Sequence, residues 1–352
     1  MAVDQERLQN FMGRMVGEFG VVASAALIVL GDKLGLYRAM AGQGAMTSSD
    51  LAKRTGMTER YLREWLAAQA AAGFVEYTPS TQTYELPAEQ ALCFADETSP
   101  VFIPGFFQVC ESMFRDLPII EEAFRTGKGV GWHEHSHALF HGTERFFRPG
   151  YATNLVSAWI PALEGVDAKL KAGASVADVG CGLGASTVLM AQAYPHSTFV
   201  GFDYHEPSIR YAREAAEKAG VADRTRFEVA AAKDYPGRDY QLVTFFDCLH
   251  DMGDPIGASA HVHQSLTPDG TWMIVEPFAN DLTEDNLNPV DRIYYAASTL
   301  ICTPASLSQE GQMGLGAQAG EARLKDVVSK GGFRQFRRAT ETPFNLVLEA
   351  RP

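Results

Sequence analysis

The sequence lacks the features of several specialised protein classes. Its 352 residues include only five cysteines, at positions 93, 110, 181, 248 and 302, and no CxxC pair. These scattered thiols exclude a disulfide framework and a zinc knuckle, and they suit a reducing compartment. No uninterrupted apolar run reaches the roughly 18 residues of a membrane span, and no basic start with an apolar core marks a secretory signal. We therefore expect a cytoplasmic protein with no membrane partner.

Basic residues are also scarce. The chain has 30 lysines and arginines against 43 aspartates and glutamates, a net charge of −13 at pH 7. Proteins that bind nucleic acid usually show a basic excess or a basic face, so the composition disfavours a nucleic-acid partner. What remains is ordinary globular material, with 46% hydrophobic residues and a length comfortable for two domains.

Residues 1–98 are predicted to form a mainly helical domain. The apolar spacing indicates one amphipathic helix over 1–20 and a second over 21–41, which either pack within the chain or are exchanged between subunits. Thr47 and Asp50 begin a further helix that ends at Gly56. Another helix runs from Thr58 to Gly73, and 74–86 reads as two strands around a Thr-Pro-Ser-Thr turn. Helix, turn, helix and hairpin make a winged helix.

A winged helix can bind DNA or serve as a dimerisation or lid module. Its second helix offers Arg60 and Arg63 but also Glu59 and Glu64, followed by alanines, a tryptophan and leucines. It lacks the cluster of basic and amide side chains that base edges and phosphates require. The sequence therefore favours the dimerisation or lid module.

Residues 99–160 are predicted to be a helical linker and pocket wall. An aromatic stretch is followed by a glycine- and histidine-rich loop at 127–142 and by a helix over 149–159. The histidines of this loop are His133, His135, His137 and His141. Their spacing differs from the i, i+4 pair of a helical zinc site, and no HExxH occurs. We expect no metal site and favour a wall facing a small ligand.

The third domain, residues 161–352, is organised around Ser175–Asp203. This stretch reads as a strand, a turn containing Gly180, Gly182 and Gly184, a helix, and a second strand closed by Asp203. Such a turn lets the backbone approach a ligand, and the acid can bind a ribose diol. Strands and helices alternate to the fifth strand at 271–277, a helical insert covers 281–320, and a hairpin closes the chain. The pattern predicts a Rossmann-like α/β fold with an antiparallel edge.

The acids around this turn favour a cationic ligand over NAD. Asp178 precedes the first glycine, where it would attract an amino group and repel a pyrophosphate. Asp234 follows the third strand, where an adenine amino group could be bound, and Asp247 follows the fourth. Ammonium, ribose and adenine contacts together fit S-adenosylmethionine.

Four segments, VADVGCGLGAS, GFDYHEPSI, VAAAKDYP and LVTFFDCLHDM, resemble the successive motifs of class I S-adenosylmethionine-dependent methyltransferases. The preceding winged helix resembles that of small-molecule O-methyltransferases, which dimerise through it, and other segments look like an actinobacterial subgroup. The resemblance implies a seven-stranded sheet, a homodimer and cofactor contacts from Asp178, Gly180, Cys181, Gly182, Asp203, Tyr204, Lys233, Asp234 and Asp247. Ala231 stands where many relatives have an acid, which leaves the adenine contact to backbone groups or Asp234.

The same resemblance implies that His250, in Leu249-His250-Asp251-Met252, is the base that takes the proton of the methylated hydroxyl. A cap or a cofactor contact is the alternative role for His250, and Met252 replaces the usual tryptophan. Asp251 and Glu276 could orient the imidazole or serve only structure. We expect methyl transfer to a small, apolar hydroxyl acceptor, in a pocket roofed by the aromatic stretch 101–114 and the insert 281–320. The alternatives are a cofactor-sensing winged-helix regulator without turnover and, more distantly, an NAD-linked oxidoreductase.

Overall fold

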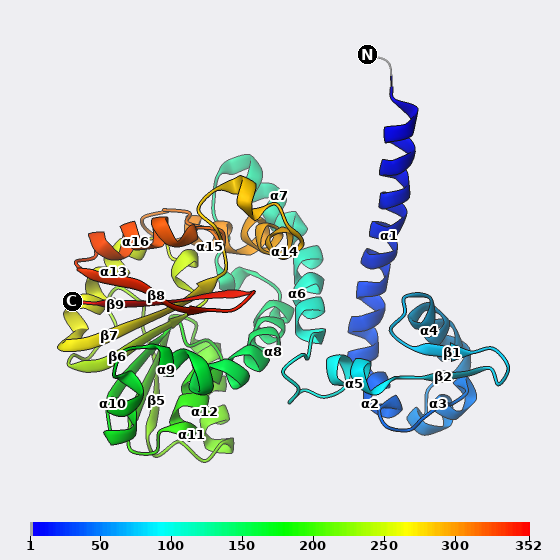
Figure 1. Cartoon of the computed structure of the whole chain (residues 1–352), viewed down its shortest axis with the longest axis horizontal. Helices are drawn as coiled ribbons and strands as arrows, with labels where there is room; N and C mark the ends of the chain where they lie inside the picture. The colour runs from blue at the N-terminus through cyan, green and yellow to red at the C-terminus, as the bar shows by residue number, and fades with distance from the viewer. Residues whose placement is uncertain (1–2) are drawn as a thin grey trace. The chain divides into compact units, whose positions relative to one another are not determined.

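The structure, a computed structural model, describes residues 3–352 and divides into two compact units (Figure 1). The first comprises 1–112 and 141–149, and the second comprises 113–140 and 150–352. The division expected from sequence was 1–98, 99–160 and 161–352. In the structure, the middle segment is not a separate body, because its parts belong alternately to the two units.

The first unit begins with one long helix, α1 (Gln5–Lys33), where the sequence predicted two. That prediction is wrong at Gly20, which stays within the helix, and the start of the expected 1–20 helix lies outside the described residues. A glycine costs a helix only about 1 kcal/mol, and no proline interrupts this one. By length and composition alone, α1 could cross a membrane, and 17% of its most apolar window is buried in this chain.

The winged helix forms as predicted. Thr47 caps α3 (Ser48–Thr55) in a reciprocal capping box with Asp50, and Gly56 ends the helix at a φ of +71°. The next helix, α4 (Glu59–Ala71), leads into the antiparallel pair β1 (Glu76–Thr78) and β2 (Thr83–Glu85). Two further helices, α2 (Leu36–Met40) and α5 (Ala88–Phe94), complete a core in which Tyr37 stacks on Phe94.

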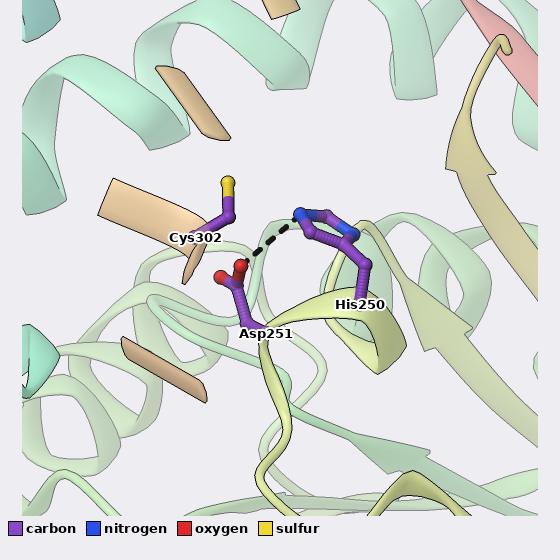
Figure 2. A group of neighbouring side chains, drawn as sticks. All are labelled: His250, Asp251 and Cys302. Atoms are coloured by element: carbon purple, nitrogen blue, oxygen red, sulfur yellow. Dashed lines mark ion pairs between the residues drawn. The ribbon is translucent and has the colours of Figure 1, made fainter. Parts of the chain in front are cut away.

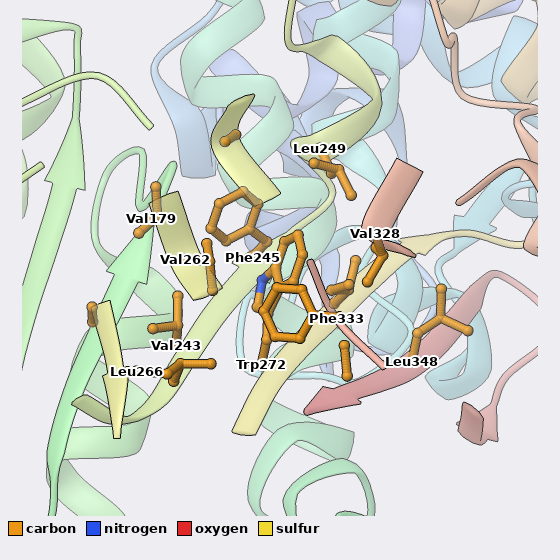
Figure 3. Close-up of a cluster of buried hydrophobic side chains, with 14 of the residues drawn as sticks. Val179, Val243, Phe245, Leu249, Val262, Leu266, Trp272, Val328, Phe333 and Leu348 are labelled. Atoms are coloured by element: carbon orange, nitrogen blue, oxygen red, sulfur yellow. The ribbon is translucent and has the colours of Figure 1, made fainter. Parts of the chain in front are cut away.

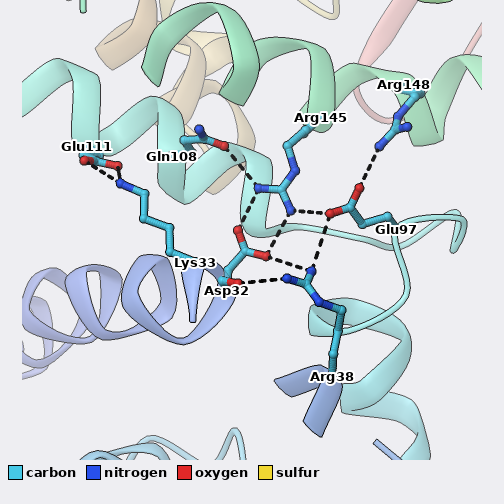
Figure 4. A network of polar contacts seen from close by, with 8 residues as sticks. All are labelled: Asp32, Lys33, Arg38, Glu97, Gln108, Glu111, Arg145 and Arg148. Atoms are coloured by element: carbon cyan, nitrogen blue, oxygen red, sulfur yellow. Dashed lines mark hydrogen bonds and ion pairs between the residues drawn. The ribbon is translucent and has the colours of Figure 1, made fainter. Parts of the chain in front are cut away.

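An ionic network ties distant segments of the first unit together (Figure 4). Arg145 donates to both carboxylate oxygens of Asp32, at 2.7 and 3.0 Å, and to Glu97 at 2.9 Å. Asp32 is only 8% exposed, so its charge needs these partners. Arg145 belongs to the stretch 141–149, and the network therefore joins that stretch to the end of α1.

The second unit is built on a seven-stranded sheet in the order β5-β4-β3-β6-β7-β9-β8 (Figure 1). The first five strands are parallel, and β9 and β8 continue antiparallel, as the sequence predicted. The strands are β3 (Ser175–Val179), β4 (Thr198–Asp203), β5 (Thr225–Val229), β6 (Tyr240–Phe246), β7 (Leu266–Pro277), β8 (Gln335–Glu341) and β9 (Asn345–Arg351). The chain runs outward from β3 and returns beside it as β6, which makes the carboxyl ends of these two strands a ligand-binding position.

Helices cover both faces of the sheet. On one face lie α11 (Ala185–Ala193) and α12 (Glu206–Lys218), and on the other α13 (Pro255–Ser265) and α16 (Gly320–Lys330) (Figure 1). The remaining second-unit elements are α7 (Leu117–Thr126), η1 (Trp132–Glu134), η2 (Leu155–Trp159), α9 (Ile160–Ala162), α10 (Val166–Ala172), η3 (Leu249–Asp251), η4 (Thr283–Asn286), α14 (Pro289–Ala297), η5 (Ser298–Cys302) and α15 (Thr303–Leu307). Two helices, α6 (Pro104–Arg115) and α8 (His137–Asn154), have residues in both units.

A fully buried aromatic group anchors the core between the sheet and α13 and α16 (Figure 3). The Trp272 ring meets Phe245 edge to face with centroids 5.0 Å apart, and Phe333 lies 5.2 Å from its other side. Each such ring contributes roughly 2–3 kcal/mol by leaving water. This core fixes β6 and β7, the two strands whose ends carry the candidate catalytic residues.

The helix expected over 149–159 begins twelve residues earlier. Ser136 precedes α8, which runs from His137 to Asn154 with Pro149 inside it, and η2 continues it as a π-helix. The expected loop at 127–142 is therefore partly helical. Sequence reasoning placed the start at Pro149 because proline favours the first turn of a helix; here the helix accommodates the proline in its interior.

Candidate functional site

The glycine turn follows β3 as predicted, and each glycine has a different role. Gly180, Gly182 and Gly184 have φ values of +74°, +52° and +85°, a region that disfavours side chains. A Cβ on Gly184 would lie 2.8 Å from the Cβ of Ala212, so this glycine lets α11 pack against α12. A Cβ on Gly182 would meet nothing within 4 Å. The space over Gly182 is thus open to a ligand.

Asp178 lies differently from the expectation. Its side chain is fully buried beneath the turn, where Ser186 and Thr187 each donate to Oδ2 at 2.6 Å and Thr244 donates to Oδ1 at 3.0 Å. Burial raises the pKa of this carboxyl, against the lowering effect of the three hydroxyls. With its oxygens held by hydroxyls and hidden from solvent, Asp178 fixes the first turn of α11 instead of presenting an acid to a ligand's amino group.

Asp203 ends β4 beside the glycine turn, at the position where the sequence predicted an acid that binds a ribose. The backbone N–H of Gly182 donates to Oδ2 at 3.0 Å, and that of His205 donates to Oδ1 at 2.9 Å. Each carboxylate oxygen has a further acceptor position, so the aligned side chain can also accept from a diol. Burial raises the pKa of Asp203, and the two backbone donors oppose the rise.

Aromatic and histidine side chains flank Asp203. Tyr204 is half-exposed and meets His133 edge-on with centroids 6.5 Å apart, and His205 stacks on Phe140 at 4.4 Å. Among the described residues the loop histidines do not gather into a metal-ligand group. His135, for example, pairs with Asp116 through Nδ1 at 2.9 Å. His133 and Phe140 of the loop thus pack against the residues that follow β4.

The other predicted cofactor residues are spread over two strand ends. Cys181 is buried in the turn, and burial raises the pKa of its thiol well above the ordinary value. Lys233 and Asp234 are exposed after β5, and Lys233 forms an ion pair with Glu310 of the segment after α15. The backbone N–H of Asp234 donates to the backbone oxygen of Ala231, within the segment that follows β5.

Asp247 follows β6 and is held by residues that the sequence did not indicate. The Tyr151 hydroxyl donates to its Oδ2 at 2.8 Å, and the Asn345 amide donates to its Oδ1 at 3.1 Å. Burial, and next the charge of Glu276, raise the pKa of Asp247 to about 7. No local pattern links Tyr151 and Asn345 to position 247, because only the folded sheet brings them together.

His250 is buried at the carboxyl end of β6, next to the end of β7. Its Nδ1 lies 2.5 Å from Oε2 of Glu276, whose Oε1 accepts the backbone N–H of Leu249 at 2.9 Å. Burial lowers the pKa of the imidazole, but the charges of Glu276 and Asp251 outweigh it and raise the pKa well above 6.5. Glu276 thus fixes the ring, with Nε2 facing Asp251.

Asp251 and Cys302 lie on the Nε2 side of His250 (Figure 2). Oδ1 of Asp251 forms an ion pair with Nε2 at 3.1 Å, and its Oδ2 accepts from Trp132 Nε1 at 3.0 Å. The thiol of Cys302 arrives from η5, within the insert after β7. Sequence reasoning missed Trp132 and Cys302. Each is more than 50 positions from Asp251 along the chain, and Cys302 reaches the site through the fold of the insert.

The insert at 281–320 covers this loop as expected for part of a pocket roof. Gln309 donates to the backbone oxygen of Asp251 at 2.8 Å, and Ser306 donates to that of Met252 at 2.7 Å. The aromatic stretch 101–114, the other expected part of the roof, lies mostly in the first unit.

In the second helix of the winged helix, the arginines form ion pairs with acids of the same helix. Arg60 pairs with Glu64 at 2.6 Å and Arg63 pairs with Glu59 at 2.7 Å, both at i, i+4 spacing. Such pairs lower the net charge offered to a phosphate backbone. The geometry agrees with the preference for a module that does not bind DNA.

Comparison with protein families finds two matches, one in each unit of the structure. Residues 22–95 match the model of the Rv2258c-like winged HTH domain, and residues 170–314 match that of a methyltransferase domain. Among curated proteins, an uncharacterised protein from Synechococcus is 30% identical over 98 residues, 27% of this chain and 23% of that protein. The 27-O-demethylrifamycin SV methyltransferase of Amycolatopsis mediterranei is 33% identical over 103 residues, 29% of this chain and 38% of that protein. The matches therefore span well under half the length of either relative.

Comparison with solved structures extends the likeness to the whole fold. Human N-acetylserotonin methyltransferase, solved in complex with S-adenosylmethionine, superposes with a TM-score of 0.73 at 15% identity, over 100% of this chain and 99% of that one. At this identity the likeness concerns the fold. Two family models, a shared fold and the predicted glycine turn lead to one conclusion: the chain carries an Rv2258c-like winged HTH domain followed by a methyltransferase domain, in the class I S-adenosylmethionine-dependent methyltransferase fold.

Proposed function

We propose that the protein transfers a methyl group from S-adenosylmethionine to a hydroxyl oxygen of a small, largely apolar acceptor, with His250 as the base. The observation that carries the proposal is the junction of β3 and β6. The glycine turn with Asp203 lies at one strand end, and the His250–Glu276 pair lies at the next. The relatives' names support an oxygen acceptor, since one is the 27-O-demethylrifamycin SV methyltransferase.

The residues at the turn fit the cofactor. The open space over Gly182 admits a close ligand, and Asp203 is oriented by two backbone donors with acceptor positions left for a ribose diol. Asp247, Glu276 and Asp251 place acids around the end of β6, which favours a cation there. When bound, S-adenosylmethionine supplies an electrophilic methyl group on a positively charged sulfur.

Methyl transfer to oxygen needs alignment and a proton acceptor. Glu276 holds Nδ1, so Nε2 is the nitrogen that can receive the hydroxyl proton. The two neighbouring carboxylates favour the imidazolium form. A bound cation opposes that charge and favours the neutral form, which can act as a base. Oδ1 of Asp251, 3.1 Å from Nε2, can stabilise the imidazolium that forms when Nε2 takes the proton.

The test is a screen of hydroxylated small molecules with the purified protein and a methyl-labelled donor. Label transfer to oxygen supports the proposal, and transfer only to nitrogen or carbon overturns the choice of acceptor atom. With an acceptor found, His250→Ala is expected to reduce kcat by about 10²–10⁴-fold while the cofactor Kd stays within about twofold. An unchanged kcat would remove His250 as the base.

We also propose a homodimer that covers α1. The helix exposes a series of large apolar side chains, which a soluble monomer rarely leaves uncovered. They are Leu8, Phe11, Met12, Val16, Phe19, Val21 and Val22, each 43–66% exposed. Sedimentation velocity of the chain and of a Phe11→Glu, Phe19→Glu double variant tests this, with Arg7→Glu as the control. A monomeric unmodified chain overturns the dimer, and binding to lipid vesicles instead would assign the face to a membrane.

A further inference from the structure

We propose that His250, Asp251 and Cys302 form a binding site for a thiophilic divalent cation such as Zn²⁺. One ligand atom from each residue lies within 4.8 Å of the others, and all three residues are buried (Figure 2). Imidazole, carboxylate and thiolate together are a donor set typical of Zn²⁺ and Co²⁺. His250 and Asp251 come from the turn after β6, and Cys302 comes from the end of η5.

The spacing agrees with a tetrahedral cation. In such a site the ligand nitrogen and oxygen lie about 3.4 Å apart and the nitrogen and sulfur about 3.6 Å apart. Nε2 and Oδ1 are already 3.1 Å apart, and the sulfur, within 4.8 Å of both, can close the rest by rotating about its Cα–Cβ bond. Three ligands from the protein leave a fourth position for water.

A second observation agrees with a cation at this position. Oδ1 of Asp251 is buried, and its ionic partner is the imidazole of His250, with Nε2 3.1 Å away. The same imidazole also pairs with Glu276, so two buried carboxylates share one positive charge. A divalent cation between Oδ1, Nε2 and the sulfur would supply the second charge.

The surroundings orient the ligands as they do in metal sites. Metal-bound histidines usually donate their other ring N–H to a carboxylate, and ligating carboxylates are themselves hydrogen-bonded. Glu276 occupies Nδ1 of His250 at 2.5 Å, and Trp132 donates to Oδ2 of Asp251 at 3.0 Å. Both partners leave free the atoms that face the proposed cation.

Binding of the cation would compete with the acceptor hydroxyl for Nε2. The imidazolium and the thiol each lose a proton when they become ligands, and the lone pair of Nε2 is then no longer available to a substrate. The protein would therefore be inhibited by Zn²⁺. This consequence rests on the proposed function, whereas the cation site itself does not.

The test is a titration of the chelator-treated full chain with Co²⁺, followed by absorption. Ligation by Cys302 predicts a thiolate-to-cobalt band in the near ultraviolet and visible bands of tetrahedral intensity, both removed by added Zn²⁺. Cys302→Ser should abolish the near-ultraviolet band, and Cys110→Ser, at a half-buried thiol of the first unit, should keep it. Glu276→Gln should weaken cobalt affinity about 10–100-fold. No band, or a band that survives Cys302→Ser in a variant with an unchanged circular dichroism spectrum, overturns the site.

A kinetic measurement separates this inference from the proposed function. Zn²⁺ should inhibit methyl transfer competitively with the acceptor and not with S-adenosylmethionine. Cobalt binding without any inhibition would overturn the shared use of Nε2. Cobalt binding by a chain that methylates no acceptor would overturn the proposed function and leave the site standing.

Discussion

The carboxylate of Glu276 spans two groups of one turn: Oε2 lies 2.5 Å from Nδ1 of His250, and Oε1 accepts the N–H of Leu249 at 2.9 Å. Glu276 is next to last in β7, and His250 follows the neighbouring strand β6. The parallel pairing of these strands thus sets the direction of the imidazole before any substrate arrives.

Replacing Glu276 should slow turnover without weakening the cofactor. Glu276→Gln keeps the shape of the side chain but removes the charge that stabilises the imidazolium formed in the reaction. We expect kcat to fall roughly 10–100-fold, less than the loss of the base itself, with the cofactor Kd unchanged by calorimetry and the pH profile of kcat shifted. Glu349→Gln, at a buried carboxylate paired with Arg337 and Arg351, is the control and should leave that profile in place.

Asp203 should govern cofactor affinity. In Asp203→Asn the ribose hydroxyls would lose charge-assisted hydrogen bonds, each typically about 1.5–3 kcal/mol, so the Kd for S-adenosylmethionine should rise about 10–100-fold. Calorimetry measures this directly. Asp223→Asn, at an exposed acid paired with Arg224, is expected to bind normally, and normal binding by Asp203→Asn would contradict the ribose assignment.

Two substitutions in the glycine turn should affect different properties: Gly184→Ala mainly the Tm, and Gly182→Ala mainly the Kd for the cofactor. Gly184→Ala places a methyl 2.8 Å from Ala212 at a φ of +85°, which should cost about 3 kcal/mol and lower Tm by roughly 5–10 °C. Gly182→Ala meets open space, so its Tm should fall less, but its methyl would stand where the cofactor approaches and raise Kd at least about tenfold. Equal effects on Tm and Kd in the two variants would refute this division of roles.

Asp247 predicts a pH dependence near neutrality. Burial raises its pKa to about 7, so the folded chain holds this proton more tightly than the unfolded chain does. The stability that it contributes is complete below the unfolded pKa and is lost as pH rises through about 7. As pH rises from 6 to 8, the Tm of Asp247→Asn should therefore increase relative to the Tm of the unmodified chain, as measured by calorimetric scans. A cationic cofactor prefers the ionised form, so its affinity should rise over the same range, and Asp247→Asn should flatten that rise.

The ionic network of the first unit should depend mainly on Arg145. Arg145→Met removes the bidentate partner of the buried Asp32 and leaves that charge to Arg38, whose nitrogen is 3.7 Å away. We expect a loss of about 2 kcal/mol, below the value for a fully buried pair because Arg145 is partly exposed. Arg148→Met, at the half-exposed neighbour that pairs with Glu97, should cost under about 1 kcal/mol in the same denaturant titration.

Local patterns predicted the elements that local forces determine. The strand, turn and helix around Gly180 and the helix start at Thr47 follow from apolar spacing, glycine and capping residues, and the structure confirms them. The continuity of α1 through Gly20 and the interior position of Pro149 in α8 do not follow, because both sequence signals also mark helix ends.

The site was predictable only where it lies next to a strand end. His250 and Asp203 follow β6 and β4 directly, so the order of strands suffices to bring them to one edge. Cys302 and Trp132 arrive from an insert and a loop, and their positions depend on tertiary packing that no short spacing encodes. Asp178 was assigned to the ligand because its three hydroxyl partners could not be inferred from position alone.

The hydroxyls around Asp178 have a consequence for the thermodynamics of ligand capture. Since Ser186, Thr187 and Thr244 all donate to this carboxylate, the turn above it is held in place by hydrogen bonds within the protein. Capture of the cofactor then loses little backbone entropy at the turn, and association can proceed at a rate set by diffusion and electrostatic attraction. The buried Asp178 thus orders the turn before the ligand binds, so that binding does not have to order it.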